Sequence, residues 1–178
     1  MRIFIYLIFC LIFFSCNEKK HEFKSVKEMN NYLNDVDNGF IAFEKTHDLI
    51  FEAKLVPSIY GDKHEQYTIH LRLSRENALS VLEIGNVNKQ EIIAREAHLS
   101  FEILSDVYLE SQSQEIKPEF SHYERNYGLK PSIDLFFYFP KFEIKEDVFF
   151  NYRDKLFGQG LIKIKFKKEL FTSFYVHE

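Results

Sequence analysis

Two alternating runs decide the fold of this chain: residues 48–56 have the sequence DLIFEAKLV, and residues 67–74 have the sequence YTIHLRLS. Every second residue in each run is apolar, and this period of two is typical of β-strands with one buried face. Pro57 ends the first run, and Gly61-Asp62 lies in the short segment between the two. The pair therefore predicts neighbouring antiparallel strands.

The same alternation continues along the chain. Apolar residues alternate over 97–109, which is longer than the five or six residues of an ordinary strand, so we expect a bend near Ser105-Asp106. A Gly158-Gln159-Gly160 turn predicts that the last two strands form a hairpin. Beyond the bend, strands are expected at 120–127, 133–139, 149–152 and 161–167. The chain then contains about eight strands in all.

Helical signals are few. Ser25-Val26-Lys27-Glu28 has the form of a capping box, which predicts a short helix that ends near Asn34. Residues 75–96 fit a short strand, a helical turn or a brief helix over 88–96. About eight strands and one convincing helix predict an all-β chain, arranged as a two-sheet antiparallel sandwich of immunoglobulin-like architecture. A small β-barrel is the alternative.

Composition narrows the class of protein. The chain has 20 phenylalanines and 10 tyrosines but no tryptophan, so we expect an aromatic core. The two cysteines, Cys10 and Cys16, lie in or next to the N-terminal apolar run, so we expect no disulfide in the folded domain. A formal net charge of −4 argues against a nucleic-acid partner, for which a basic domain is typical.

The N-terminus has the layout of an export signal. Arg2 precedes an apolar run over 3–14, and Ser15-Cys16 follows it. The run is shorter than the roughly 20 apolar residues that a membrane-spanning helix needs. We therefore expect a signal peptide at 1–15, a tether at 16–24 and a single domain at 25–178.

The sequence Phe13-Phe14-Ser15-Cys16 resembles the bacterial lipobox, and its phenylalanine-rich form is similar to that of Bacteroidetes lipoproteins. The resemblance implies that Cys16 is acylated and becomes the new N-terminus. Two or three acyl chains give far firmer anchoring than one. It also implies a position in the cell envelope. We expect the anchor to lie in the outer membrane, with the domain either in the periplasm or at the cell surface.

No catalytic motif occurs in the chain, so we favour a non-catalytic module that binds an envelope protein, without a cofactor or metal. His70 and Arg72 share the outer face of one strand and are candidates for contact with an anionic group. Three lysines alternate with apolar residues on the last strand, a pattern that protects edge strands and also suits anionic lipid. The full set of candidate contact residues is His70, Arg72, Tyr123, Tyr127, Lys163, Lys165 and Lys167.

The alternative hypothesis is an enzyme or a ligand carrier. It places four polar side chains in one pocket, where they would have to converge to within bonding distance of a metal or substrate. These residues are His47, Asp62, His64 and His122. The sequence leaves the oligomeric state open.

Overall fold

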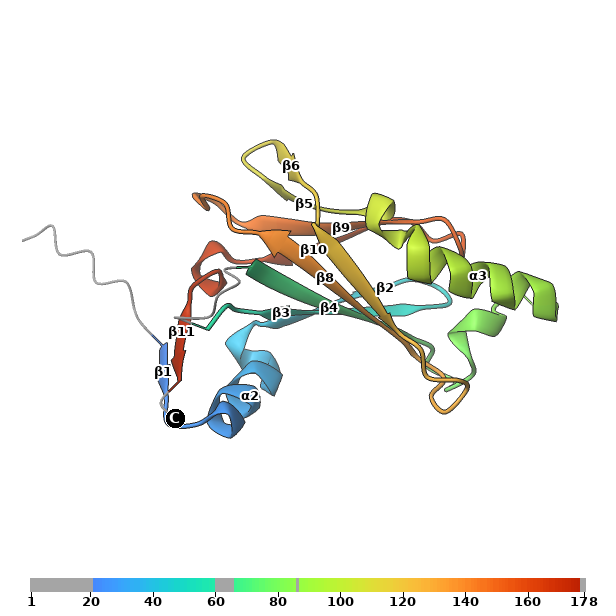
Figure 1. Cartoon of the computed structure of the whole chain (residues 1–178), viewed down its shortest axis with the longest axis horizontal. Helices are drawn as coiled ribbons and strands as arrows, with labels where there is room; N and C mark the ends of the chain where they lie inside the picture. Colours follow the sequence, from blue (N-terminus) through green and yellow to red (C-terminus); the bar gives the residue numbers. More distant parts are fainter. Residues whose placement is uncertain (1–20, 60–65, 86, 177–178) are drawn as a thin grey trace, which may run out of the picture.

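Two antiparallel sheets face each other in the computed structural model, which describes residues 21–59, 66–85 and 87–176 (Figure 1). The first sheet has the order β2 (Ile41–Lys45), β3 (Ile50–Val56), β4 (Gln66–Ser74), β8 (Ile133–Pro140) and β7 (Phe120–Glu124). The second has the order β10 (Gly160–Phe166), β9 (Val148–Asp154), β5 (Val107–Ser111) and β6 (Gln114–Ile116). The predicted sandwich is confirmed, and within the described residues its sheets do not close into the alternative barrel.

Alternation in the sequence becomes alternation in burial. Phe51 pairs with Leu73 across β3 and β4, and Leu55 pairs with Ile69; all four side chains are fully buried. The residues between them lie on the outer face of the sheet and are only partly buried. The antiparallel pairing predicted for these two runs is therefore confirmed.

Aromatic rings fill the space between the sheets. Phe137 on β8 lies 5.9 Å from Phe150 on β9, measured between ring centroids, and Phe51 on β3 lies 6.1 Å from Tyr152 on β9. These rings are fully buried, and each removes a large apolar area from water. The predicted aromatic core is the layer that holds the two sheets together.

The N-terminal helix α2 (Val26–Asn34) begins where the sequence predicts. The Ser25 hydroxyl accepts a hydrogen bond from the Glu28 N–H at 3.2 Å. The Glu28 carboxylate accepts from the Lys24 N–H at 2.8 Å, one residue earlier than an ordinary capping box requires. Met29 and Leu33 are buried, so one stripe of the helix packs on the sandwich.

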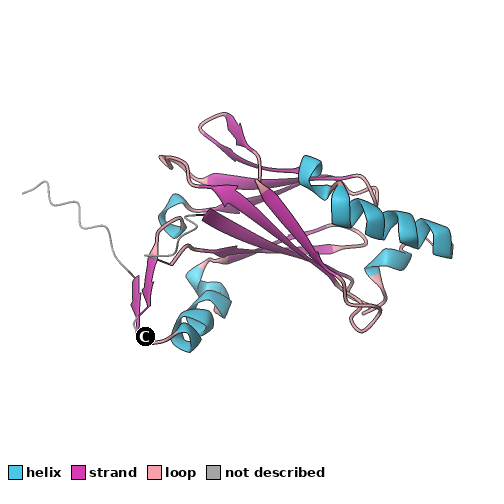
Figure 2. Cartoon of the chain, viewed as in Figure 1, coloured by secondary structure: helices cyan, strands magenta, loops and turns pink. Residues whose placement is uncertain are grey.

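The strand expected at 97–104 is wrong, because α3 (Lys89–Phe101) occupies that segment (Figure 2). Asn88 and Glu91 form a complete capping box that starts the helix. Leu99 is fully buried whereas Phe101 is 80% exposed, so the apparent period of two does not describe one buried face. The 3-10 helix η4 (Ile103–Asp106) then leads into β5, so the expected bend within one long strand near Ser105-Asp106 is also wrong.

Two polar side chains of α3, Arg95 and His98, fix the helix to its surroundings. Arg95 donates to the carbonyl oxygens of Leu82, in the 3-10 helix η3 (Val81–Glu83), and of Ile84, at 2.7 and 2.9 Å. His98 contacts the fully buried carboxylate of Asp106 at 2.6 Å, and Lys155 forms an ion pair with the same carboxylate. No helix within the described ranges has the length and apolar character required to cross a bilayer.

The two ends of the described chain meet. β1 (His21–Phe23) pairs in parallel with β11 (Phe174–Val176), so residues 21–23 of the expected tether form a strand that pairs within the fold. Phe23, Tyr32 and Phe174 form a cluster of rings beneath this pair, with centroids 5.0 to 6.2 Å apart. Two more 3-10 helices, η2 (Val36–Asn38) and η5 (Lys168–Leu170), complete the elements.

Candidate functional site

The β1–β11 pair lies at one end of the sandwich, and a group of turns lies at the other (Figure 1). Ile59, just beyond the end of β3, forms a bridge with Phe174 of β11. The opposite end of β3 begins at Ile50, about 20 Å away for a strand of this length. We call that end, with the turns at 46–49, 75–79 and 125–132, the distal end.

The β2–β3 turn presents two polar residues there. The Thr46 N–H donates to the Leu49 carbonyl at 2.9 Å, and the Leu49 N–H donates to the Thr46 hydroxyl at 3.2 Å. Leu49 is buried and anchors the turn in the core. His47 and Asp48, at the tip, are exposed.

The segment after β4 forms a second turn beside the first. Ile50 pairs with Ser74, so the residues just before β3 and just after β4 lie at the same corner of the sheet. The Ala78 N–H donates to the Arg75 carbonyl at 3.1 Å, and Ala78 has a left-handed φ of +55°. An ion pair between Lys45 and Glu76 joins the two turns.

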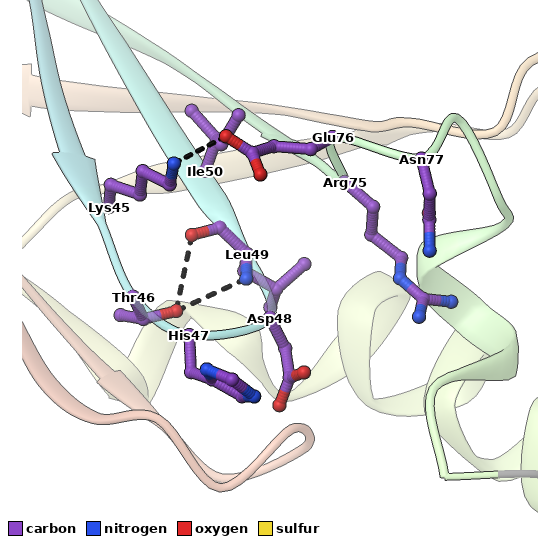
Figure 3. Close-up of a pocket in the computed structure, with 9 residues that line it drawn as sticks. All are labelled: Lys45, Thr46, His47, Asp48, Leu49, Ile50, Arg75, Glu76 and Asn77. Atoms are coloured by element: carbon purple, nitrogen blue, oxygen red, sulfur yellow. Dashed lines mark hydrogen bonds and ion pairs between the residues drawn. The ribbon is translucent and has the colours of Figure 1, made fainter.

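Between the turns lies an open hollow of about 170 Å³ (Figure 3). We call it the distal hollow. Arg75 and Asp48 line it, and in Figure 3 both charged ends point to the same open side. Neither side chain has a hydrogen bond or an ion pair with the residues that the structure describes. Further lining comes from Lys45, His47, Glu76 and Asn77.

A second hollow of about 320 Å³ adjoins the first, because Arg75 lines both. Its other walls come from Leu79, Glu83 and Gly85. Leu79 is 56% exposed, so one wall of this hollow is an exposed apolar side chain. Arg75 therefore lies between two adjoining recesses.

The β7–β8 loop adds apolar side chains at the same end. The Leu129 N–H donates to the Asn126 carbonyl at 2.9 Å, and Tyr127 and Gly128 have φ values of +49° and +80°, as in a tight hairpin turn. Tyr127 is 84% exposed and Leu129 is 87% exposed. This turn ends β7 at Glu124, earlier than the strand expected at 120–127.

The structure joins this loop to the second turn. The Val81 N–H, in η3, donates to the Pro131 carbonyl at 3.0 Å. Leu79 precedes η3 and Leu129 precedes Pro131 on the two joined segments. The distal end is therefore a connected surface with polar hollows and apolar tips.

His70 and Arg72, predicted to contact an anion, already contact one within the protein. His70 Nε2 lies 2.8 Å from Asp134 Oδ1 on β8, and Arg72 Nε donates to the same oxygen at 2.8 Å. The hydrogen bond from His70, despite burial and with help from Arg72, lowers the pKa of Asp134 to about 2. The His70 ring also stacks on Phe136 at 4.4 Å. These residues form a polar cluster on the outer face of the sheet, with little charge left for a ligand.

The three candidate lysines, Lys163, Lys165 and Lys167, differ in their ion pairs. β10 is an edge strand, as expected, and its lysines are exposed. Lys163 pairs with Glu110 at 2.9 Å, and Lys165 pairs with Asp147 at 2.7 Å. Lys167 lies just beyond β10, which ends at Phe166; it is exposed and has no ion pair with the described residues. The expected basic stripe is thus largely neutralised.

Other predicted residues do not come together. Tyr123 is buried in the core, where burial raises its pKa, so of the tyrosine pair only Tyr127 is available to a partner. His47 lines the distal hollow, whereas His122 lies on the outer sheet face, 6.3 Å from Phe136. Asp62, His64 and Cys16 lie outside the described residues.

The pocket of the alternative hypothesis therefore is not formed by its two described members, His47 and His122. Within the described ranges no three His, Cys, Asp or Glu side chains are grouped closely enough to hold a metal. Sequence reasoning missed Arg75. Nothing in its neighbourhood along the chain distinguishes it from a solvated residue after a strand.

Comparison with known proteins finds no matching family model, no similar curated protein and no similar solved structure.

Proposed function

We propose that this chain is a lipid-anchored envelope protein whose distal end binds a protein partner without catalysing a reaction. The single observation that carries the proposal is the placement of the distal end at the opposite end of the sandwich from β1, which follows the lipobox-like segment (Figure 1).

The reach of the anchor supports this arrangement. His21, where β1 begins, is five positions after Cys16, and at about 3.6 Å per residue this distance is at most about 18 Å. An acylated Cys16 would hold the β1–β11 end near the membrane, expected to be the outer membrane. The sandwich would then carry the distal end away from the lipid.

The chemistry of the distal end suits a protein partner. Tyr127, Leu129 and Leu79 are large apolar side chains, and each is more than half exposed. Their loops are tied by hydrogen bonds, so little conformational freedom is lost when a partner covers them. Exposed aromatic and aliphatic side chains next to recesses are the usual anchors of protein interfaces.

Site-specific photocrosslinking in native membranes tests the proposal. A photoreactive phenylalanine analogue at position 127 should give one discrete adduct with an envelope protein. The same analogue at Val26, an exposed residue of α2 at the opposite end, is the matched control and should give none. Equal adducts from both positions, or none from position 127, would contradict the proposal.

A further inference from the structure

We propose that the distal hollow is a binding site for a small zwitterion, of the class of the free α-amino acids. Two side chains of opposite charge, Arg75 and Asp48, line this one recess. Neither has a polar partner among the described residues. A ligand with a carboxylate and an ammonium group would satisfy both at once.

The remaining charges of the hollow are already balanced. Lys45 and Glu76 form an ion pair with each other across the two turns. An anion alone would meet Arg75 but would also face the Asp48 carboxylate, and a cation alone would face Arg75. The unpaired charges are thus one positive and one negative, which favours a ligand that carries both.

The size of the recess fits the same class. Its volume of about 170 Å³ lies below the roughly 300–1,000 Å³ of pockets for drug-sized molecules. A recess of this size suits a compact ligand better than a drug-sized one. Alanine, with six non-hydrogen atoms, is a compact member of the proposed class.

The chemistry of the walls gives each ligand group a place. The Arg75 guanidinium can donate two parallel hydrogen bonds to the ligand carboxylate, which a lysine cannot do. The Asp48 carboxylate can accept from the ligand ammonium group. The Asn77 amide N–H groups and the His47 ring offer further polar contacts, since only the Asn77 carbonyl oxygen is engaged, by the Leu79 N–H at 3.1 Å.

This inference does not depend on the anchor or on a protein partner. Amino-acid binding to the purified chain would stand if position 127 gave no adduct, and the adduct would stand if no amino acid bound. Either proposal can therefore be refuted without refuting the other.

The experiment is calorimetric titration of the full chain in detergent at constant ionic strength. The probes are L-alanine, sodium acetate as the anionic half and methylammonium chloride as the cationic half. We expect binding of alanine that is at least about tenfold tighter than binding of either half. No heat with alanine, or acetate binding as tight as alanine, would overturn the proposal.

Variants locate the site. Arg75→Gln and Asp48→Asn should each weaken alanine binding at least about tenfold, and Arg75→Lys should retain part of it. The charge-matched controls Lys167→Gln and Asp37→Asn change exposed residues outside the hollow and should bind as the wild type does. Circular dichroism of every variant verifies the fold. Unchanged binding in Asp48→Asn would mean that the hollow binds only the carboxylate group of the ligand. That result would overturn the proposal of a zwitterion site.

Discussion

Arg72 on β4 lies directly opposite Asp134 on β8, and its Nε donates to Asp134 Oδ1 at 2.8 Å. His70, two residues before Arg72 on β4, contacts the same carboxylate oxygen. A side chain that is almost completely buried thus carries a negative charge with two bonded partners. Buried charges are tolerated when they are paired in this way.

Asp134→Asn should lower the free energy of unfolding by about 2 kcal/mol near pH 7, from a pKa shift between 3.8 and about 2. Because the pKa is lowered in the folded state, this stabilisation is present above about pH 4 and is lost as the pH falls through 2. Urea unfolding of both proteins at pH 7, 4 and 2 measures it. The difference between them should shrink toward pH 2, and a difference that stays constant with pH would refute the charge pairing.

Phe150→Ala should cost about 3–5 kcal/mol of unfolding free energy, because it removes a fully buried ring that packs on Phe137 between the sheets. Phe120→Ala is the matched control, since that ring is 59% exposed on an edge strand. Its cost should be less than about 1 kcal/mol. Denaturant titration followed by circular dichroism separates the two, and similar costs would mean that the rings do not hold the layers together.

Asp154→Ala should destabilise the β9–β10 turn by about 2 kcal/mol or more. The Asp154 carboxylate accepts hydrogen bonds from the backbone N–H groups of Leu156, Phe157 and Gln159 and from the Tyr152 hydroxyl. Removing it leaves buried donors without a partner. Amide hydrogen exchange should rise at 156–159 while β3 stays protected. Unaltered exchange in that turn is the result that would count against this role.

Cys16→Ser should move the protein from the membrane fraction to the soluble fraction, because serine cannot carry the thioether-linked lipid. Cys10→Ser, within the apolar run, should leave the distribution unchanged. Fractionation followed by immunoblotting measures both. Retention of the Cys16→Ser protein in the membrane fraction would exclude lipid at this position as the anchor.

The sandwich could be predicted because burial on one face of a strand leaves a period of two in the sequence. That rule failed at 97–104, where Asn88 and Glu91 cap a helix and override a chance alternation that includes the exposed Phe101. The capping residues can be seen in the sequence. The sequence does not show that they favour a helix more strongly than the alternation favours a strand. The parallel β1–β11 pair could not be predicted, since its residues lie at opposite ends of the chain.

The distal hollow was beyond sequence reasoning for a related reason. Asp48 and Arg75 are neighbours only because the β3–β4 register sets Ile50 opposite Ser74. His70 and Arg72 were correctly placed on one outer face, but Asp134, which binds both, comes from β8. The alternation in a sequence predicts which face of a sheet a side chain lies on. Its bonding partner depends on which strand lies next to it in the sheet.

The β1–β11 pair also sets an order of events during folding. β1 is the first described element to be synthesised, and β11 is the last, yet within the described chain each has the other as its strand partner. Because the two strands lie at opposite ends of the described chain, bringing them together closes a long loop and has a high entropic cost. We therefore expect this pair to form after strands that are close in the sequence, such as β3 and β4, have already paired.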